Sequence, residues 1–362
     1  MEDRIDPWGS FQIKDYDKVF KEFGLNRIPE DWKDTLDHHL FSRGIVIAHR
    51  DFNKIISRVE NRQPFIMMTG IASSGRMHIG HKLIVDLALF MKSIGARMYF
   101  GIADIDGYVS RSDMKVDSMQ KAKEFAANNL ANALALGLDK KDVYIQSRYK
   151  PRYYEFAFEL SKKITVNTFE GIYGHLDLGK MAANFLQYAD ILHPQLKEFE
   201  GKMPSVTPVA LDQDPHIRAV RDIAKRLPYN MELPTSIYPV HLPGLKPGSK
   251  MSSSVPESSI FLDDTPEEVE KKIRTAFSGG AATLEEHRKH GGNPDVDVAF
   301  QILKFHCPDD KKVNQLRQKF LEGTITSGEM KEEAIKFVIK FLKEHQRKFK
   351  KFEPVARKMV FG

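Results

Sequence analysis

Two short motifs combine residue types that can bind the phosphates of a nucleotide. The first is His-Ile-Gly-His over residues 78–81, and the second, about 170 residues later, is Lys-Met-Ser-Ser-Ser over residues 250–254. Histidine N–H groups can donate to phosphate oxygens, and a lysine can neutralise the charge that develops on a leaving pyrophosphate. Each motif alone is weak evidence, but both in this order indicate activation of a carboxylate with ATP.

The first motif follows a loop of small residues. Segment 65–69 is apolar, and segment 70–75 is rich in serine and glycine, which allows a close approach between backbone and phosphate. His78 and His81 are three positions apart, so they share one face of the helix that follows. Gly80 leaves room for a base or a ribose to pack on the backbone. A metal site is the competing interpretation, but no cysteine or carboxylate lies nearby at ligand spacing.

The second motif follows a segment whose composition is typical of a mobile loop. Residues 243–249 include two prolines and two glycines, so the loop could close Lys250 over a ligand. The serines at 252–254 add hydroxyl donors. Because Ser253 stands where such motifs commonly have a second lysine, we expect most of the pyrophosphate charge to fall on Lys250. Taken alone, this segment is equally consistent with a polar surface turn.

Strands and helices alternate around these motifs. We expect strands at 44–48, 65–69, 97–103, 143–145, 206–211 and 235–240, and helices at 80–93, 115–137 and 215–227. This alternation predicts an α/β fold with a doubly wound parallel sheet of the Rossmann type. Residues 152–200 are expected to form a helical insertion, and the chain beyond residue 265 is expected to be all-helical.

Composition excludes several classes of protein. The 362 residues contain one cysteine, Cys307, which excludes an intrachain disulfide and a thiolate-rich metal cluster. No stretch approaches the ~18 apolar residues of a membrane span, and the charged N-terminus has no apolar signal core. We therefore expect a cytoplasmic protein. The net charge is +6, and the basic stretch 336–352 is either a solvated helix face or a phosphate-binding one.

Together, the two motifs resemble those of class I aminoacyl-tRNA synthetases. Further blocks narrow the resemblance to tryptophanyl-tRNA synthetases of the archaeal and eukaryotic type, and they cover almost the whole chain. These blocks are residues 6–8, 49–51, 210–215 with Arg218, Arg221 and Asp222, 258–262, 276–280, 285–288 and 291–298.

The resemblance implies a two-step reaction without a covalent enzyme intermediate. L-Tryptophan would react with Mg·ATP to give tryptophanyl-adenylate, and the acyl group would then pass to tRNA(Trp). The resemblance further implies an N-terminal extension (1–60), a catalytic domain (61–264, with the motif loop at 243–256) and a helical anticodon-binding domain (265–362). A homodimer would form through the insertion at 152–205. No protein-bound metal site is expected.

Together, the motifs and the resemblance predict two sets of site residues. Catalytic roles are expected for His78, His81, Lys250, Ser252 and Ser254. The nucleotide site is expected to comprise Thr69, Gly70, Ser73, Ser74, Gly75, His78, Gly80, His81, Asp212, Lys250 and Met251.

The resemblance also places the amino-acid pocket. Asp106 matches an acidic residue that holds the substrate ammonium, and Gln187 and Gln213 match two pocket glutamines. Met68 stands where eukaryotic relatives have a tyrosine, and Gly101 stands where they have a glutamine. Likewise, Ile71 and Ser73 replace an arginine and a proline.

Asp190 resembles the aspartate that recognises the side chain in bacterial tryptophanyl and in tyrosyl synthetases. An indole presents only an N–H donor, so the group that recognises it must be an acceptor, which Asp190 and Gln213 both are. Met68 would then form an adaptable apolar wall. A surface carboxylate is the alternative for Asp190.

Three other functions stay open. Asp190 could equally accept from a phenol, so a tyrosine–tRNA ligase is the second hypothesis. The third is an adenylyl-transferring enzyme without tRNA, which the basic C-terminal stretch argues against. An inactive, synthetase-like RNA-binding protein is the fourth, but His78, Gly80, His81 and Lys250 are all present.

Overall fold

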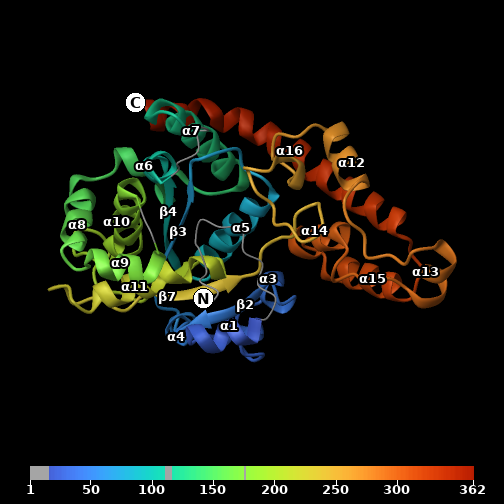
Figure 1. The fold of residues 1–362 in the computed structure, drawn as a ribbon, viewed down its shortest axis with the longest axis horizontal. Coiled ribbons are helices and arrows are strands. Elements are labelled where there is room, and N and C mark those ends of the chain that lie inside the picture. The colour runs from blue at the N-terminus through green and yellow to red at the C-terminus, as the bar shows by residue number, and fades with distance from the viewer. Residues whose placement is uncertain (1–15, 111–115, 175–176) are drawn as a thin grey trace.

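A central sheet with helices on both sides organises the chain in the computed structural model (Figure 1), which describes residues 16–110, 116–174 and 177–362. The resemblance block at residues 6–8 therefore lies outside the described residues. The strands are β1 (Asn26–Arg27), β2 (Val46–Arg50), β3 (Phe65–Ala72), β4 (Ala96–Ala103), β5 (Val143–Ile145), β6 (Ser205–Pro208) and β7 (Thr235–Pro239).

The sheet has the order β1-β2-β7-β6-β3-β4-β5. From β7 to β5 all neighbours are parallel, which confirms the predicted Rossmann-type sheet. The chain runs from β3 to β4 and β5 on one side, and it returns on the other side with β6 and β7. Ligands of such sheets bind beyond the carboxyl ends of the strands at this reversal, here between β3 and β6.

The edge of the sheet beyond β7 departs from the purely parallel prediction. Strand β2 pairs antiparallel with β7, and β1 pairs antiparallel with β2. Residues before position 60, which we expected to form an extension, thus supply two strands of the same sheet. β1 and β2 are short and pair antiparallel at this edge. The alternation of strands and helices that predicts a parallel sheet therefore does not indicate where they lie.

Alternation along the strands separates two apolar layers. Met67 faces one layer and Met68 the other; likewise Val143 and Ile145 share a layer, whereas Tyr144 points to the opposite face. This is the two-residue period of a strand that is buried on both sides. The side chains of Met68 and Tyr144 therefore reach the same face of the sheet.

The helices cover these two faces. The α-helices are α1 (Tyr16–Phe23), α2 (Trp32–Thr35), α3 (His39–Ser42), α4 (Asn53–Glu60), α5 (Ile79–Ser93), α6 (Asp104–Val109), α7 (Met119–Leu136), α8 (Pro151–Ser161), α9 (Val166–Tyr173), α10 (Leu178–Leu192), α11 (Asp214–Ala224), α12 (Pro266–Arg274), α13 (Leu284–His290), α14 (Val298–His306), α15 (Asp310–Leu321) and α16 (Ser327–Phe361). Short 3-10 helices are η1 (Lys140–Asp142), η2 (Gln146–Arg148), η3 (His193–Gln195), η4 (Leu211–Gln213) and η5 (Pro256–Ser258). Among the described residues, none of the helices has the length and apolar character that a membrane span needs.

The C-terminal helix returns to the sheet and packs along α7 (Figure 1). Thr326 caps its first turn, because Thr326 Oγ1 accepts from the Glu329 N–H at 3.2 Å. Farther along, His345 Nε2 donates to Asn132 Oδ1 of α7 at 2.8 Å in a buried contact. The all-helical C-terminal region thus packs directly on the α/β part.

Several predicted boundaries need correction. Strand β3 continues to Ala72, so the loop before α5 covers residues 73–78 and begins three residues later than the predicted 70–75. Helix α7 begins at Met119 rather than at 115, because Ser118 caps it by accepting from the Lys121 N–H at 3.2 Å. Helix α6 was not predicted, since its six residues are too short to show a helical period.

Candidate active site

Two adjoining cavities lie at the carboxyl ends of the parallel strands. One has a volume of about 460 Å³ and contains both motifs. The other has about 290 Å³ and lies over the face that Met68 and Tyr144 reach. Because they share part of their lining, groups bound in the two cavities can meet. The shared residues are Gly70, Ile71, Ala72, Ile84, Ala210 and Gln213.

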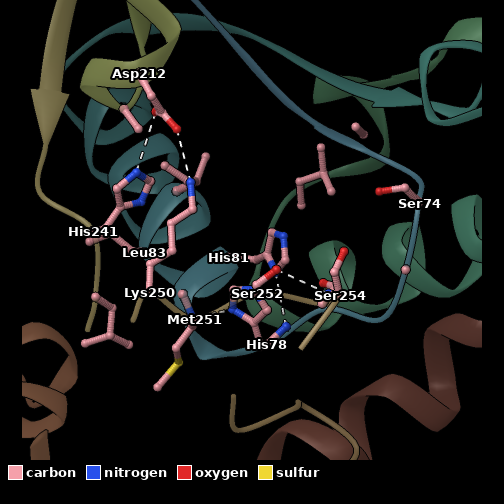
Figure 2. A pocket seen from close by; sticks show the side chains of 18 of the residues that line it. Ser74, His78, His81, Leu83, Asp212, His241, Lys250, Met251, Ser252 and Ser254 are labelled. Carbon is pink, nitrogen blue, oxygen red and sulfur yellow. Dashed lines mark hydrogen bonds and ion pairs between the residues drawn. The ribbon is translucent and has the colours of Figure 1, made fainter. Parts of the chain in front are cut away.

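The two histidines of the first motif cap helix α5 (Figure 2). His78 Nδ1 accepts from the Gly80 N–H at 3.1 Å, and His81 Nδ1 accepts from the His78 N–H at 3.1 Å. This is a reciprocal capping box in which imidazoles replace the usual hydroxyl and carboxylate. The motif therefore begins the helix as well as lining the larger cavity.

Capping also fixes how the imidazoles are protonated. A ring nitrogen that accepts from a backbone N–H carries no proton, so the proton of each ring lies on Nε2. Burial lowers the pKa of His81 to about 4 and holds the pKa of His78 well below its ordinary value. Both side chains are therefore neutral hydrogen-bond donors at pH 7, not cations.

Gly80 has a structural role in addition to its place in the lining of the larger cavity. A Cβ at this position would lie 2.9 Å from Cε1 and Nδ1 of His78. The absence of a side chain at Gly80 thus makes room for the His78 ring. Any side chain at Gly80 would displace the capping imidazole.

The lysine of the second motif forms an ion pair in the larger cavity. Lys250 Nζ donates to Asp212 Oδ2 at 3.1 Å, and His241 Nε2 lies 3.6 Å from Asp212 Oδ1 (Figure 2). Burial alone would raise the pKa of Asp212, but its interactions with His241 and with Lys250 lower it. Asp212 thus stays ionised and pairs with Lys250.

Serine contacts join the two motif segments. Ser253 Oγ donates to the Arg76 carbonyl at 2.8 Å. Ser252 Oγ accepts from the Ser254 N–H at 3.2 Å, and the Ser252 N–H donates to Ser259 Oγ at 2.8 Å. The Ser253 contact holds the lysine motif against the segment that leads into α5, and the two Ser252 contacts order the motif itself.

A buried carboxylate organises the smaller cavity. Asp190 Oδ1 accepts from the hydroxyls of Tyr144 and Tyr153, each at 2.6 Å, and Oδ2 accepts from Gln146 Nε2 at 3.2 Å. Burial raises the pKa of Asp190 to about 7 despite these donors, and the nearby charge of Asp106 adds to the rise. Asp190 is therefore a buried cavity residue and not a surface carboxylate.

Comparison with known proteins agrees with this geometry. The sequence profile of the class I tRNA synthetases of the W and Y type matches residues 60–343. A tryptophan–tRNA ligase of Methanocaldococcus jannaschii is 39% identical over 99% of this chain and 98% of its own. One from Encephalitozoon cuniculi is 34% identical over 97% and 96%. The crystal structure of tryptophanyl-tRNA synthetase from Aeropyrum pernix K1 has a TM-score of 0.88 at 38% identity, over 98% of both chains.

The chain belongs to the tryptophanyl-tRNA synthetase family. Two of the blocks behind the predicted resemblance form ion pairs that join the sheet to helix α11. Arg50 donates to Asp214 at 2.9 Å, and Arg221 donates to Asp51 at 2.6 Å. In this synthetase these pairs fasten β2 to α11, and Asp214 directly follows the cavity residues Asp212 and Gln213.

Most of the predicted residues line the cavities. In the larger cavity are Gly70, Ser74, Gly75, His78, Gly80, His81, Asp212, Lys250, Met251, Ser252 and Ser254. In the smaller one are Met68, Thr69, Asp106, Gln187, Asp190 and Gln213. Gln213 lines both.

Two residues predicted for the nucleotide site lie outside the larger cavity as the described residues form it. Thr69 lines the smaller cavity, because it comes earlier along β3 than the residues that reach the larger one. Ser73 is fully buried outside both cavities as the described residues form them. Its N–H donates to the Ala103 carbonyl at 3.0 Å, and a Cβ on Gly107 would lie 2.7 Å from the Ser73 carbonyl oxygen. Ser73 therefore joins β3 to the start of α6.

Sequence reasoning missed several cavity residues in this synthetase. Gln146 directly follows β5, and His241 comes two residues after β7, so their places at carboxyl strand ends could have indicated both. Tyr144 lies inside an apolar strand and Asn129 inside α7, where no pattern separates them from core residues. Asn129 lines the larger cavity, and both of its buried side-chain polar atoms lack a partner among the described residues.

Proposed function

We propose that this chain is a tryptophan–tRNA ligase that uses ATP to form tryptophanyl-adenylate and then charges tRNA(Trp). One observation carries the proposal: a cavity with phosphate-binding groups shares a wall with a cavity of acceptor groups and apolar residues. The relatives named tryptophan–tRNA ligase match this chain over nearly its full length, which favours tryptophan over tyrosine.

In the first step, a carboxylate oxygen of tryptophan attacks the α-phosphorus of ATP. The bond from this phosphorus to the bridging oxygen breaks, and pyrophosphate leaves. The Nε2–H groups of His78 and His81 donate to phosphate oxygens, and Lys250 neutralises the charge on the leaving group. Because each group acts by position and charge, no side chain needs to form a covalent bond.

In the second step, a ribose hydroxyl at the tRNA 3′ end attacks the adenylate carbonyl, and AMP leaves. The shared wall at residues 70–72 and Gln213 is where this carbonyl would lie, since it joins the amino acid to the nucleotide.

In the smaller cavity, Asp106 would hold the substrate ammonium. Gln187 and Gln213 would bind polar atoms of the amino acid, and Met68 would pack on the indole. Asp190 would provide the acceptor environment that an indole N–H requires.

Magnesium would enter as part of the Mg·ATP substrate. In residues 16–110, 116–174 and 177–362, no group of three or more histidine, cysteine, aspartate or glutamate side chains is placed to hold a metal ion. Phosphate oxygens and water would thus supply most of the ligands, as is common for Mg²⁺.

The insertion at 152–205 is the proposed interface of a homodimer. It carries large apolar side chains that are exposed in the single chain: Phe158 at 77%, Val166 at 58% and Leu178 at 83%. Burying such residues against a second copy would remove a substantial apolar area from water.

The helical region 265–362 is the proposed anticodon-binding unit, next to the catalytic unit 61–264 and the segment 1–60. Exposed lysines follow the outer face of α16, among them Lys343, Lys350 and Lys351, and they could contact tRNA phosphates. A cytoplasmic location would suit this function, and it agrees with a single, buried cysteine.

Charging of tRNA tests the proposal. Purified full-length protein would be incubated with ATP, labelled tryptophan and a tRNA(Trp) transcript, with labelled tyrosine and a tRNA(Tyr) transcript as the matched control. We expect acid-precipitable label only in the tryptophan reaction. Charging of tRNA(Tyr) with tyrosine alone, or no charging at all, would overturn it.

A further inference from the structure

The two tyrosines bound to Asp190 occupy different places relative to the smaller cavity. Both hydroxyls donate to Asp190 Oδ1 at 2.6 Å. Tyr144 lines the cavity, whereas Tyr153 is fully buried on α8 and lies outside the cavity as the described residues form it. Of the two tyrosines, Tyr144 is therefore the one that can contact both Asp190 and a ligand in the cavity.

Gly101 sets the position of the Tyr144 hydroxyl. A Cβ on Gly101 would lie 2.9 Å from Tyr144 Oη and 3.1 Å from Cζ. Gly101 lines the cavity, so the hydroxyl above it lies at the cavity floor. Any larger residue at 101 would displace the hydroxyl from this place.

The hydrogen bond to Asp190 determines what Tyr144 offers to a ligand. A tyrosine hydroxyl has one proton and accepts through its oxygen. Its proton is committed to Asp190, so toward the cavity the oxygen is an acceptor only. Asp190 itself already accepts three hydrogen bonds, from Tyr144, Tyr153 and Gln146, which leaves about one of the four acceptor sites of a carboxylate.

We propose that Tyr144 Oη is the specificity-determining acceptor for the indole N–H of tryptophan, and that Asp190 is the positioning residue that holds the Tyr144 proton. Asp190 thus acts on the substrate through Tyr144. This inference rests on the proposed function, since it assigns tryptophan to the smaller cavity.

The test compares Tyr144→Phe with Tyr153→Phe, because each removes one donor from the same oxygen of Asp190. Each protein is assayed by ATP–pyrophosphate exchange with tryptophan and with β-(3-benzothienyl)-alanine, in which sulfur replaces the indole N–H. We expect the wild type to prefer tryptophan by about 10–100-fold in kcat/KM. In Tyr144→Phe the preference should shrink to about threefold or less, and in Tyr153→Phe it should persist.

An unchanged preference in Tyr144→Phe would overturn the inference, as would an equal loss in both variants. Gly101→Ala provides a second variant, which keeps the phenol but displaces its hydroxyl, and it should also lose the preference. Tryptophan-dependent exchange by the wild-type protein distinguishes a failure of the proposed function from a failure of the role of Tyr144. No tryptophan-dependent exchange in the wild type refutes the proposed function, whereas exchange with an unaltered preference in the variants refutes only the role of Tyr144.

Discussion

Single side chains in this site act mainly through the protonation state that their neighbours impose. The imidazoles of His78 and His81 are neutral because burial and backbone contacts leave them no second proton. The cationic side chain among the two motifs is that of Lys250, which forms an ion pair with Asp212 in the larger cavity. We therefore expect the histidines to act by hydrogen bonding and the lysine by charge neutralisation.

Replacing Lys250 by alanine should therefore slow adenylate formation by about 10²–10³-fold, because pyrophosphate leaves without its counter-charge. Tryptophan binding should change little, since Lys250 does not line the smaller cavity among the described residues. Stopped-flow measurements of adenylate formation and of tryptophan binding check this prediction. Lys246→Ala is the matched control: Lys246 is exposed in the same loop and pairs with Glu257 at 3.5 Å. Equal losses in rate and in tryptophan affinity would refute the assigned role.

The pH dependence of tryptophan binding should follow Asp190. Burial raises its pKa to about 7. The carboxylate that accepts hydrogen bonds from both tyrosine hydroxyls therefore becomes a carboxylic acid as the pH falls. Tryptophan affinity should then decrease about tenfold from pH 8 to pH 6. Calorimetric titration with tryptophan at each pH measures this affinity. Asp190→Asn removes the titrating group and should bind with the same affinity at both values, while a pH-independent wild type would contradict this account.

At the scale of elements, one segment often serves both folding and chemistry. The start of α5 is the example, because the rings that are expected to donate to phosphate also cap the helix. A single substitution there should change both helix capping and the donation to phosphate. A different substitution at the same position can separate the two effects.

His78→Ala should lower the free energy of unfolding by about 1 kcal/mol through loss of the N-cap. His78→Asn should restore that stability, because asparagine is a strong N-cap, but it should not restore the rate of adenylate formation. Thermal melts and pyrophosphate exchange distinguish the two effects. If asparagine rescues both, the histidine acts only by capping.

The sequence predicted the elements with strong local signals, but it did not predict the contacts that depend on how those elements pair. Strands β3, β4 and β5 and helix α5 lie where apolar periodicity and the small-residue loop indicated. The antiparallel place of β2 depends on long-range pairing with β7, which no local pattern contains. The place of Tyr144 in the cavity also depends on long-range pairing, since its contact with Gly101 exists only once β4 and β5 lie in register.

At the scale of the whole molecule, α7 connects the C-terminal helices to the larger cavity. Asn132 of α7 accepts from His345 of α16, and Asn129, one turn earlier, lines the larger cavity. The helical region therefore packs against the α/β part through the same helix that lines this cavity.

Charge reversal at Lys350 and Lys351 should impair tRNA charging but not amino-acid activation. Losing two phosphate contacts should lower kcat/KM for tRNA by about tenfold or more at low salt, with pyrophosphate exchange unchanged. Lys141→Glu is the control, because Lys141 lies in η1 at the amino end of β5, away from the catalytic edge of the sheet. A parallel loss of exchange activity would show that the effect is on folding.

The most direct test of the central claim is ATP–pyrophosphate exchange by the wild-type protein with each amino acid in turn. If the two adjoining cavities bind ATP and tryptophan as proposed, exchange should be stimulated by tryptophan and not by tyrosine. Stimulation by tyrosine in place of tryptophan, or no stimulation by any amino acid, would contradict the account.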